Sequence, residues 1–224
     1  MTISADRTKQ VLSEFGRQRI LVVGDLMLDR YIYGSVSRIS PEAPVPVVHV
    51  NSEKSMAGGA ANVAWNVTSL GAKAAVSGVL GKDRAAEELK AILAQTGVAT
   101  AGSLETGDLP TIVKTRVIAE RQQVVRVDRE GDGELDDGQL AVFCENLRKG
   151  VSDATGVILE DYGKGVIRQA VVDVVLEAAK RNGVPVGLDP KDNHELTIRG
   201  VTVATPNRRE AFAIAGVRET AAGP

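Results

Sequence analysis

Cysteine, histidine and aromatic residues are scarce in this chain of 224 residues. Cys144 is the single cysteine, which excludes an internal disulfide framework and a cysteine-based metal cluster. Aromatic residues make up only 3% of the chain, so a surface that stacks nucleic-acid bases is not expected. With two histidines and no nucleophile motif beside them, a Ser-His-Asp hydrolase is not expected either.

Long apolar runs and an excess of one charge are also absent. No segment approaches the ~20 apolar residues of a membrane helix, and residues 1–19 lack the apolar core of a secretion signal. The formal net charge is -2, so we expect neither a nucleic-acid partner nor a membrane partner. Together with 43% hydrophobic residues, these features predict a cytoplasmic protein in which residues 1–224 form a single domain, or one domain with a small appendage.

What the chain does contain is an alternation of short β-branched runs with helical patterns. This alternation predicts βαβ units, a parallel sheet and an α/β fold. The predicted strands are 19–25, 74–79, 156–159, 184–188 and 201–204; the predicted helices are 4–17, 60–70, 84–95, 136–149, 166–181 and 207–215.

Two segments, about 30–50 and 111–129, interrupt this rhythm because they contain strand patterns without helices. They cannot be covered on both faces like the strands of the main sheet. We therefore expect a separate small β-layer that either covers a site or pairs with a second subunit.

A glycine-rich turn stands before one of the predicted helices. Residues 57–62 read Ala-Gly-Gly-Ala-Ala-Asn, and Gly58 and Gly59 leave backbone N–H groups open to close approach by a ligand. Asn62 would lie in the first helical turn, where its amide suits the binding of sugar hydroxyls. An ordinary strand-to-helix turn explains the same residues equally well.

Polar side chains also follow the predicted strands, where ligands bind in open α/β sheets. Asp25 and Asp29 follow the first strand; we favour a structural role for Asp25 and ligand binding for Asp29. Asn207 and Glu210 would share one face of a helix, although a simple capping box accounts for them as well. Other candidates at strand ends are Asp161, Lys164 and Lys191.

The ordered set of these motifs resembles the ribokinase (phosphofructokinase-B) family of sugar kinases. Within the family, the chain is most similar to the D-glycero-β-D-manno-heptose 7-phosphate kinases, over about residues 8–216. Glu160 departs from that subgroup, in which a serine is expected. The family motifs are Gly24–Asp29, Gly58–Asn62, Gly81–Asp83 and Asn207–Glu210, and the subgroup stretches are 23–31, 38–47, 121–123 and 161–165.

The resemblance implies a ribokinase-like parallel sheet with helices on both faces and a small β-lid. It implies transfer of the ATP γ-phosphoryl to the anomeric hydroxyl of the heptose 7-phosphate, giving the 1,7-bisphosphate of lipopolysaccharide core synthesis, with ATP and Mg²⁺ as cofactors. It also implies a homodimer formed through the lid. The implied substrate-binding residues are Asp29, Gly58, Gly59, Asn62, Arg116, Asp161 and Lys164; the nucleotide side would have Lys191, Asn207 and Glu210, with Glu210 reaching Mg²⁺ through water.

One element of the family is missing from the sequence. The Gly-Ala-Gly-Asp turn, whose aspartate is the family's catalytic base, does not occur up to Pro224. We therefore expect the base beyond Pro224 and a chain that is nearly inert by itself. The alternatives are a non-catalytic fragment for sugar-phosphate binding or dimerisation, and a kinase of the family for another sugar.

Overall fold

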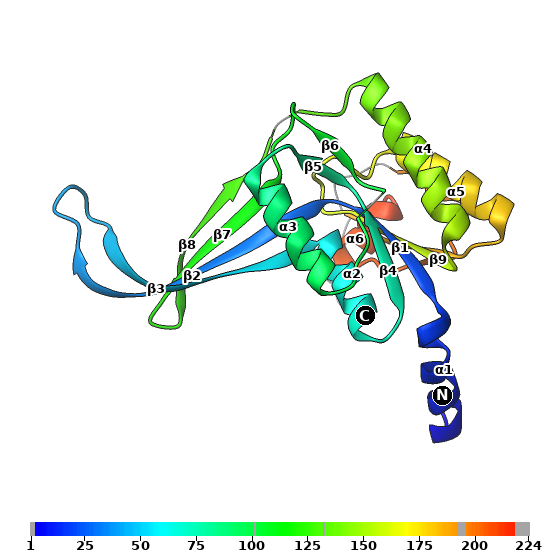
Figure 1. Ribbon diagram of the computed structural model, residues 1–224, viewed down its shortest axis with the longest axis horizontal. Helices are drawn as coiled ribbons and strands as arrows, with labels where there is room; N and C mark the ends of the chain where they lie inside the picture. Colours follow the sequence, from blue (N-terminus) through cyan, green and yellow to red (C-terminus); the bar gives the residue numbers. More distant parts are fainter. Residues whose placement is uncertain (1–2, 101, 132, 192–195, 218–224) are drawn as a thin grey trace.

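The core of the molecule is a five-stranded parallel sheet with the strand order β11-β10-β9-β1-β4 (Figure 1). The computed structural model describes residues 3–100, 102–131, 133–191 and 196–217. The central strand β1 (Arg19–Gly24) pairs with β4 (Lys73–Ser77) and β9 (Gly156–Glu160). Strands β10 (Val186–Asp189) and β11 (Val203–Ala204) extend the sheet beyond β9.

Helices cover both faces of this sheet because the side chains of β1 alternate between two apolar cores. Leu21 and Val23 pack with α4 (Asp137–Asp153) and α5 (Gln169–Asn182). Val22 points to the opposite face, toward the core that contains α2 (Ala60–Ser69) and α3 (Arg84–Gln95). The predicted α/β fold with a parallel sheet and helices on both faces is therefore confirmed.

Helices α3 and α4 begin after residues whose side chains satisfy free backbone N–H groups. Asp83 Oδ1 accepts a hydrogen bond from the Ala86 N–H at 2.9 Å at the start of α3. Asp136 and Gln139 form a reciprocal capping box at the start of α4. These caps explain why the helical patterns in the sequence predicted the start of both helices to within one residue.

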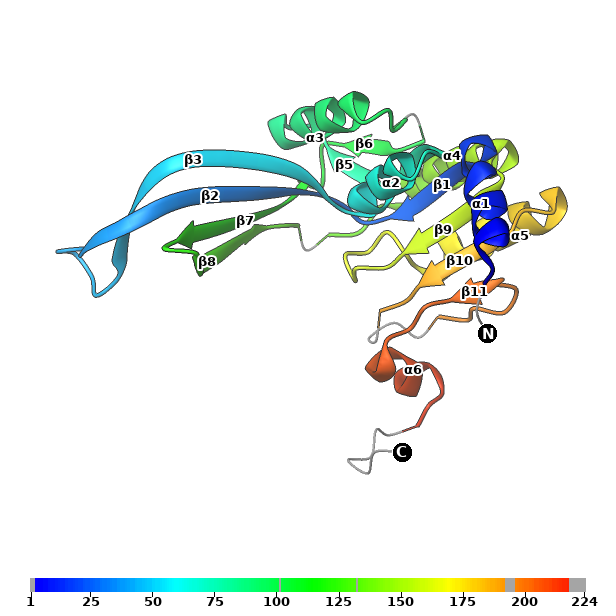
Figure 2. The ribbon, with the colours of Figure 1, turned by 90° about the horizontal axis from the view of Figure 1, so that it is seen from below.

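The second sheet is the lid, with the strand order β3-β2-β7-β8. Figure 2 shows it extending far beyond the main sheet, with the β2–β3 hairpin reaching farther than β7 and β8. Strands β2 and β7 are parallel to each other, while β3 and β8 pair antiparallel at the two edges. The lid strands are β2 (Leu26–Ile39), β3 (Pro46–Gly59), β7 (Ile112–Ala119) and β8 (Gln122–Arg129).

Several predicted boundaries are wrong. The lid begins at Leu26 and its second strand runs on to Gly59, well past the predicted limit at residue 50. The predicted strand 74–79 is split, because Val79–Gly81 (β5) leaves the main sheet and pairs with Leu104–Thr106 (β6). The predicted helix 4–17 is the helix α1 (Ala5–Ser13) followed by a short 3-10 helix (Phe15–Arg17).

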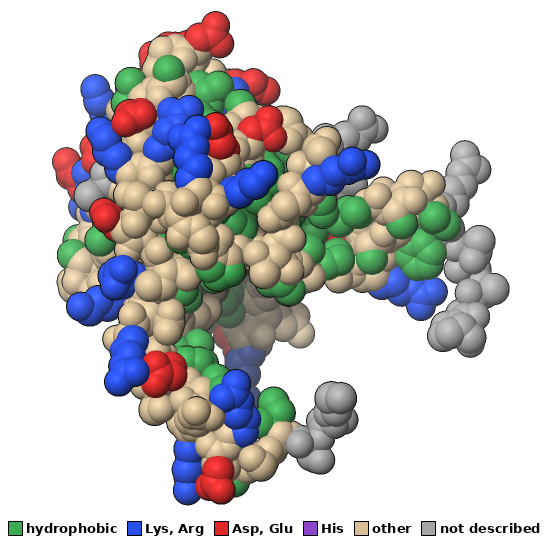
Figure 3. Space-filling view, turned by 90° about the vertical axis from the view of Figure 1, so that its right-hand side faces the viewer, with side chains coloured by type: hydrophobic (Ala, Val, Ile, Leu, Met, Phe, Trp, Pro, Cys, Tyr) green, Lys and Arg blue, Asp and Glu red, His purple; other side chains and the backbone are tan. Residues whose placement is uncertain are grey.

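The end of the described chain carries α6 (Arg208–Ile214), next to the edge strand β11. In Figure 3 this segment projects to the right, and hydrophobic side chains gather on it. Val203, Ile214 and Val217 are about half exposed there. An apolar surface therefore lies along the β11 side of the molecule. No helix among the described residues is long and apolar enough to span a membrane.

Candidate functional site

The candidate site lies at the carboxyl ends of the central strands. The pairing register aligns the last residues of three neighbouring strands, Gly24, Glu160 and Asp189. The segments that leave these strands carry four of the polar residues singled out in the sequence: Asp25, Asp161, Lys164 and Lys191. Because parallel strands end at the same sheet edge, residues far apart in the chain are brought to one place.

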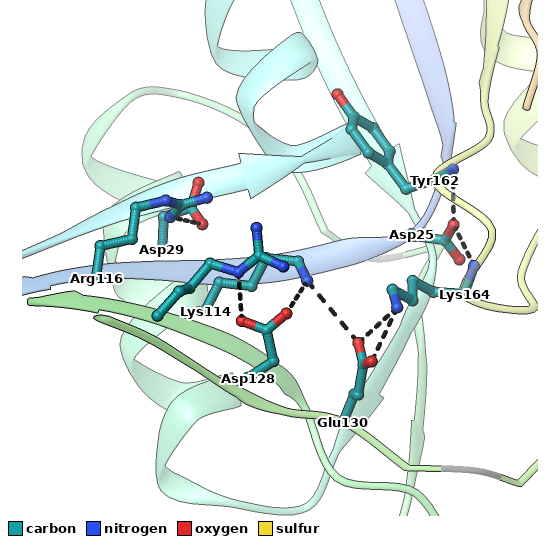
Figure 4. Close-up of polar contacts among 9 residues, drawn as sticks. Asp25, Asp29, Lys114, Arg116, Asp128, Glu130, Tyr162 and Lys164 are labelled. Atoms are coloured by element: carbon teal, nitrogen blue, oxygen red, sulfur yellow. Dashed lines mark hydrogen bonds and ion pairs between the residues drawn. The ribbon is translucent and has the colours of Figure 1, made fainter. Parts of the chain in front are cut away.

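Asp25 organises one of these loops from within. Its side chain is fully buried, and its carboxylate accepts hydrogen bonds from the backbone N–H groups of Tyr162 and Lys164 at 2.9 and 3.1 Å (Figure 4). A third hydrogen bond, of 3.1 Å, comes from the Val166 N–H. Burial raises the pKa of Asp25, although the three N–H donors oppose that effect. The structural role favoured for Asp25 therefore agrees with its contacts.

Gly58 and Gly59, expected as a turn, are the last two residues of β3 and lead directly into α2 at the base of the lid. Gly59 has φ of 56° and precedes the first residue of the helix. A Cβ atom at Gly58 would lie 2.7 Å from Asp29 Oδ2, so the bare backbone lets this carboxylate lie directly over the turn. Asn62 follows in the first turn of α2, and its side chain makes no hydrogen bond to another described residue.

Asp29 is paired with a lid cation in this structure. Arg116 on β7 donates to Asp29 Oδ1 at 2.6 Å, and this hydrogen bond raises the pKa of Arg116. The Arg116 guanidinium also lies 5.4 Å from the centre of the Tyr31 ring. The structure therefore brings together three predicted substrate-binding residues, Asp29, Gly58 and Arg116.

A chain of ion pairs continues from the lid to the main sheet (Figure 4). Lys114 contacts Asp128 at 3.0 Å and Glu130 at 3.9 Å. Glu130 in turn binds Lys164 at 2.7 Å, and Lys164 belongs to the loop that Asp25 holds. The predicted residue Lys164 is thus connected to the lid. The sequence interpretation missed Asp128 and Glu130, for which only the strand register provides a signal.

A cavity of about 370 Å³ lies at this junction of lid and sheet. Its walls come from the base of the lid, the segment after β8 and the loop 163–166. A cavity of this size at the carboxyl ends of parallel strands suits a small polar ligand.

The predicted nucleotide-binding residues lie toward β10 and β11. Asn207 Oδ1 accepts from the Glu210 N–H at 3.0 Å, while Glu210 Oε2 accepts from the Asn207 N–H at 2.8 Å. This pair is a capping box, as the simpler interpretation of the motif predicts. Glu210 is buried, and Lys191 is exposed. No contact joins these residues to Asp29 or Arg116 within the described chain.

Two acidic residues lie at the end of β9: Glu160 is its last residue and Asp161 follows it. Asp161 is buried and accepts a hydrogen bond from the Gly163 N–H at 2.8 Å. Glu160 is only 7% exposed, and its Oε2 atom has no hydrogen-bond partner among the described residues. Burial first, and then the nearby Asp189 carboxylate, raise the pKa of Glu160 to about 7.

Comparisons with solved structures define the class of this architecture. The fold matches the ribokinase of Arabidopsis thaliana in complex with ribose and ATP, with a TM-score of 0.60, 20% identity and coverage of 91% of this chain and 65% of that one. It also matches the tetrameric inhibited form of phosphofructokinase-2 from Escherichia coli, with a TM-score of 0.67, 19% identity and coverage of 91% and 66%. The fold is therefore ribokinase-like.

Sequence comparisons identify the family. The model for pfkB family carbohydrate kinases matches residues 17–222, so the chain belongs to this family. It is 44% identical over 208 residues to the bifunctional protein HldE of Azorhizobium caulinodans, covering 92% of this chain and 43% of that protein. The corresponding protein of Desulfatibacillum aliphaticivorans is 41% identical, with coverage of 92% and 42%. The chain thus spans less than half the length of these relatives.

Proposed function

We propose that the protein carrying this chain is an ATP-dependent kinase for D-glycero-D-manno-heptose 7-phosphate. The reaction would move the γ-phosphoryl group of ATP to the anomeric hydroxyl and give the 1,7-bisphosphate. The observation that carries the proposal is the Asp29–Arg116 pair above the bare Gly58 backbone. It offers a carboxylate for sugar hydroxyls and a guanidinium for the phosphate that the sugar already bears. Membership of the carbohydrate kinase family supports the reaction type.

The two partners of this pair would separate when the sugar phosphate binds. Asp29 would accept hydrogen bonds from neighbouring hydroxyls, which replace those from Arg116. Arg116 would turn to the 7-phosphate, for which its planar guanidinium is well suited, and Lys114 would add a second positive charge from the same lid face. The lid would then cover the sugar and exclude water, which limits wasteful hydrolysis of ATP.

ATP and Mg²⁺ would bind at the ends of β10 and β11. The residues present fit this role: Lys191 is an exposed cation, and Glu210 is a buried carboxylate of the type that holds Mg²⁺ through a water molecule. Asn207 would keep Glu210 in place through the capping box. When bound, Mg²⁺–ATP supplies the phosphoryl group and the charge neutralisation for its transfer.

Arg116→Gln in the full-length protein tests the substrate. We expect the KM for heptose 7-phosphate to rise by about 10- to 100-fold, because a charge-assisted contact to phosphate is lost. Arg30→Gln is the matched control, since Arg30 lies on the opposite face of the lid from Asp29 and forms a 2.7 Å ion pair with Glu88 of α3. Steady-state kinetics of the full-length protein with a panel of sugars and sugar phosphates measures which substrate it prefers. A preference for ribose, fructose phosphate or a nucleoside would overturn the substrate assignment.

The 224-residue chain by itself is proposed to bind the sugar phosphate without turning over ATP. The described residues include the Asp29–Arg116 pair and the glycine turn, whereas the Gly-Ala-Gly-Asp motif does not occur in the sequence. Calorimetry with heptose 7-phosphate, next to an ATPase assay, separates the possibilities. Binding without hydrolysis agrees with the proposal, and measurable ATP turnover by the chain alone contradicts it.

A further inference from the structure

A second cavity, of about 360 Å³, lies away from the strand ends that form the candidate site. Its walls come from the first half of β1, from β4, from residues 99 and 102, and from the last turns of α4. Helix α4 packs closely over β1, because a Cβ atom at Gly150 would lie only 3.1 Å from Leu21 Cδ2. Strand β4 is the last strand of the five-stranded sheet, and Ala99 pairs with Ala75 on its outer edge.

Two polar groups in this cavity lack partners. Ser77 is 1% exposed, and its Oγ atom has no hydrogen bond among the described residues. Asn146 on α4 also makes no side-chain hydrogen bond to a described residue. A buried hydroxyl without a partner costs free energy, so a ligand that supplies the missing hydrogen bond gains affinity.

The rest of the wall is apolar and made of small side chains. Alanines and glycines leave the space open, and Ile20 and Leu21 add larger apolar groups. Such a wall fits a flat or branched hydrocarbon body rather than a sugar. The small lining residues are Ala74, Ala75, Ala99, Gly102, Gly150 and Ala154.

The rim of the cavity is positively charged. Arg19, Lys73 and Lys149 stand there beside the Asp153 carboxylate, and Lys149 also lies 3.7 Å from Glu145 Oε1. Arg19 is positioned by its Nε atom, which donates to the Asp153 carbonyl at 2.7 Å. Three cations around an apolar cavity favour an anionic ligand whose charged group remains near the solvent.

We propose that this cavity binds a small amphipathic carboxylate with a polar group at its opposite end. The apolar body would fill the space between β4 and α4, the carboxylate would meet the rim cations, and the distal polar group would bond to the Ser77 hydroxyl. Hydroxyaryl carboxylates have this arrangement. The inference does not depend on the proposed kinase reaction, because none of its residues belongs to the candidate site.

An NMR titration of the 224-residue chain with ¹³C-methyl-labelled alanine tests the proposal. The probe is 6-hydroxy-2-naphthoate, compared with 2-naphthoate, which lacks the hydroxyl, and 2-naphthol, which lacks the carboxylate. We expect saturable shifts of the methyl signals of Ala74, Ala75 and Ala99, with the tightest binding for the hydroxynaphthoate. Shifts confined to other alanines such as Ala211 and Ala213 of α6, or no saturable shift at all, would overturn the proposal.

Two variants separate the hydroxyl contact from the charge contact. Ser77→Ala removes the unpartnered hydroxyl without adding bulk, and it should weaken hydroxynaphthoate binding about fivefold while leaving naphthoate within about twofold. Lys73→Gln combined with Lys149→Gln should weaken both carboxylates and leave naphthol unchanged. Lys180→Gln on α5 is the charge control, outside the cavity. An equal effect of Ser77→Ala on both carboxylates would contradict the assigned orientation.

Discussion

The buried carboxyl group of Glu160, at the end of β9, makes the stability of the protein depend on pH. Its neighbour across the register is Asp189, so the two acids cannot both ionise without repulsion. Because its pKa is raised to about 7, folded Glu160 keeps its proton between about pH 4.5 and 7, where the unfolded chain has lost it. The free energy of unfolding therefore falls as pH rises through this window.

Glu160→Gln should remove this pH dependence. We expect the variant to be more stable than the natural chain at pH 8, by roughly 1–3 kcal/mol, because it avoids ionising a buried group. At pH 4 the two proteins should have similar stability, since both then carry a neutral side chain. Urea unfolding at both pH values measures the difference. A stability gain of the same size at both pH values would contradict the explanation.

Neutralising Asp25 should lower the stability, in contrast to Glu160, because the Asp25 carboxylate acts only as a hydrogen-bond acceptor for backbone N–H groups. Asp25→Asn replaces one of the two acceptor oxygens by an NH₂ group, which then faces one or two of the three backbone N–H donors, and should lower the free energy of unfolding by roughly 2–4 kcal/mol. Thermal unfolding and limited proteolysis of the 162–166 loop measure the effect. The control is Asp6→Asn on the exposed helix α1, for which we expect a change below about 0.5 kcal/mol.

At the scale of elements, the β7–β8 hairpin contains an unusual turn. Glu120 and Arg121 have φ values of 48° and 66°, and they join the paired residues Ala119 and Gln122. Two central residues with positive φ are typical of a type I′ turn, which prefers Asn-Gly. Neither glutamate nor arginine adopts this conformation easily.

Replacing Glu120 with Asn and Arg121 with Gly should therefore stabilise the lid. We expect a gain of about 1 kcal/mol in the free energy of unfolding, because backbone strain at two positions is relieved. Equilibrium urea unfolding gives the value, and hydrogen exchange of β7 and β8 shows whether the gain is local. An unchanged or lower stability would mean that the turn is not strained in the natural chain.

The elements also show which features of the fold a sequence can reveal. Strands β1 and β9 were predictable because both faces are buried and their residues are continuously apolar. The second half of β3 was missed because its exposed residues 51–54, Asn-Ser-Glu-Lys, have no apolar alternation. Strands β5 and β6 have three residues each, too few to give a periodic signal.

The candidate site was predictable only in part, for a similar reason. Asp29, the glycine turn and the capping pair on α6 are local patterns that the sequence carries directly. The Asp29–Arg116 contact joins residues 87 positions apart, and it depends on the parallel register of β2 and β7. The place of Glu130 in the site likewise depends on contacts with two lysines, Lys114 on β7 and Lys164 in the loop after β9. Long-range register is not visible in one sequence.

At the scale of the whole molecule, the lid leaves apolar side chains in solvent. Every residue of β8 is exposed, and Val125 and Val127 are 47% and 56% exposed on the lid face opposite Arg116. An exposed edge strand with apolar residues is a site for pairing with another chain. We propose that two copies of the chain associate through their lids.

Val125→Asp combined with Val127→Asp tests this association. Sedimentation velocity should give a dimer, about twice 23.6 kDa, for the natural chain and a monomer for the double variant. Ile214→Asp is the matched control, because Ile214 is similarly exposed at 46% but lies on α6. A natural chain that stays monomeric at high concentration, or a dimer that Ile214→Asp dissociates, would contradict association through the lid.

The central position of β1 has a consequence for how the protein is made. One neighbour of β1, strand β4, follows within about 50 residues, but the other, β9, is about 136 residues away, as shown by the Arg19 N–H bond to the Thr155 hydroxyl. At the usual rate of translation of 5–20 residues per second, roughly 7–27 s pass between the synthesis of β1 and that of β9. During this time one edge of an apolar strand has no partner, so the nascent chain is open to aggregation for longer the more slowly it is synthesised.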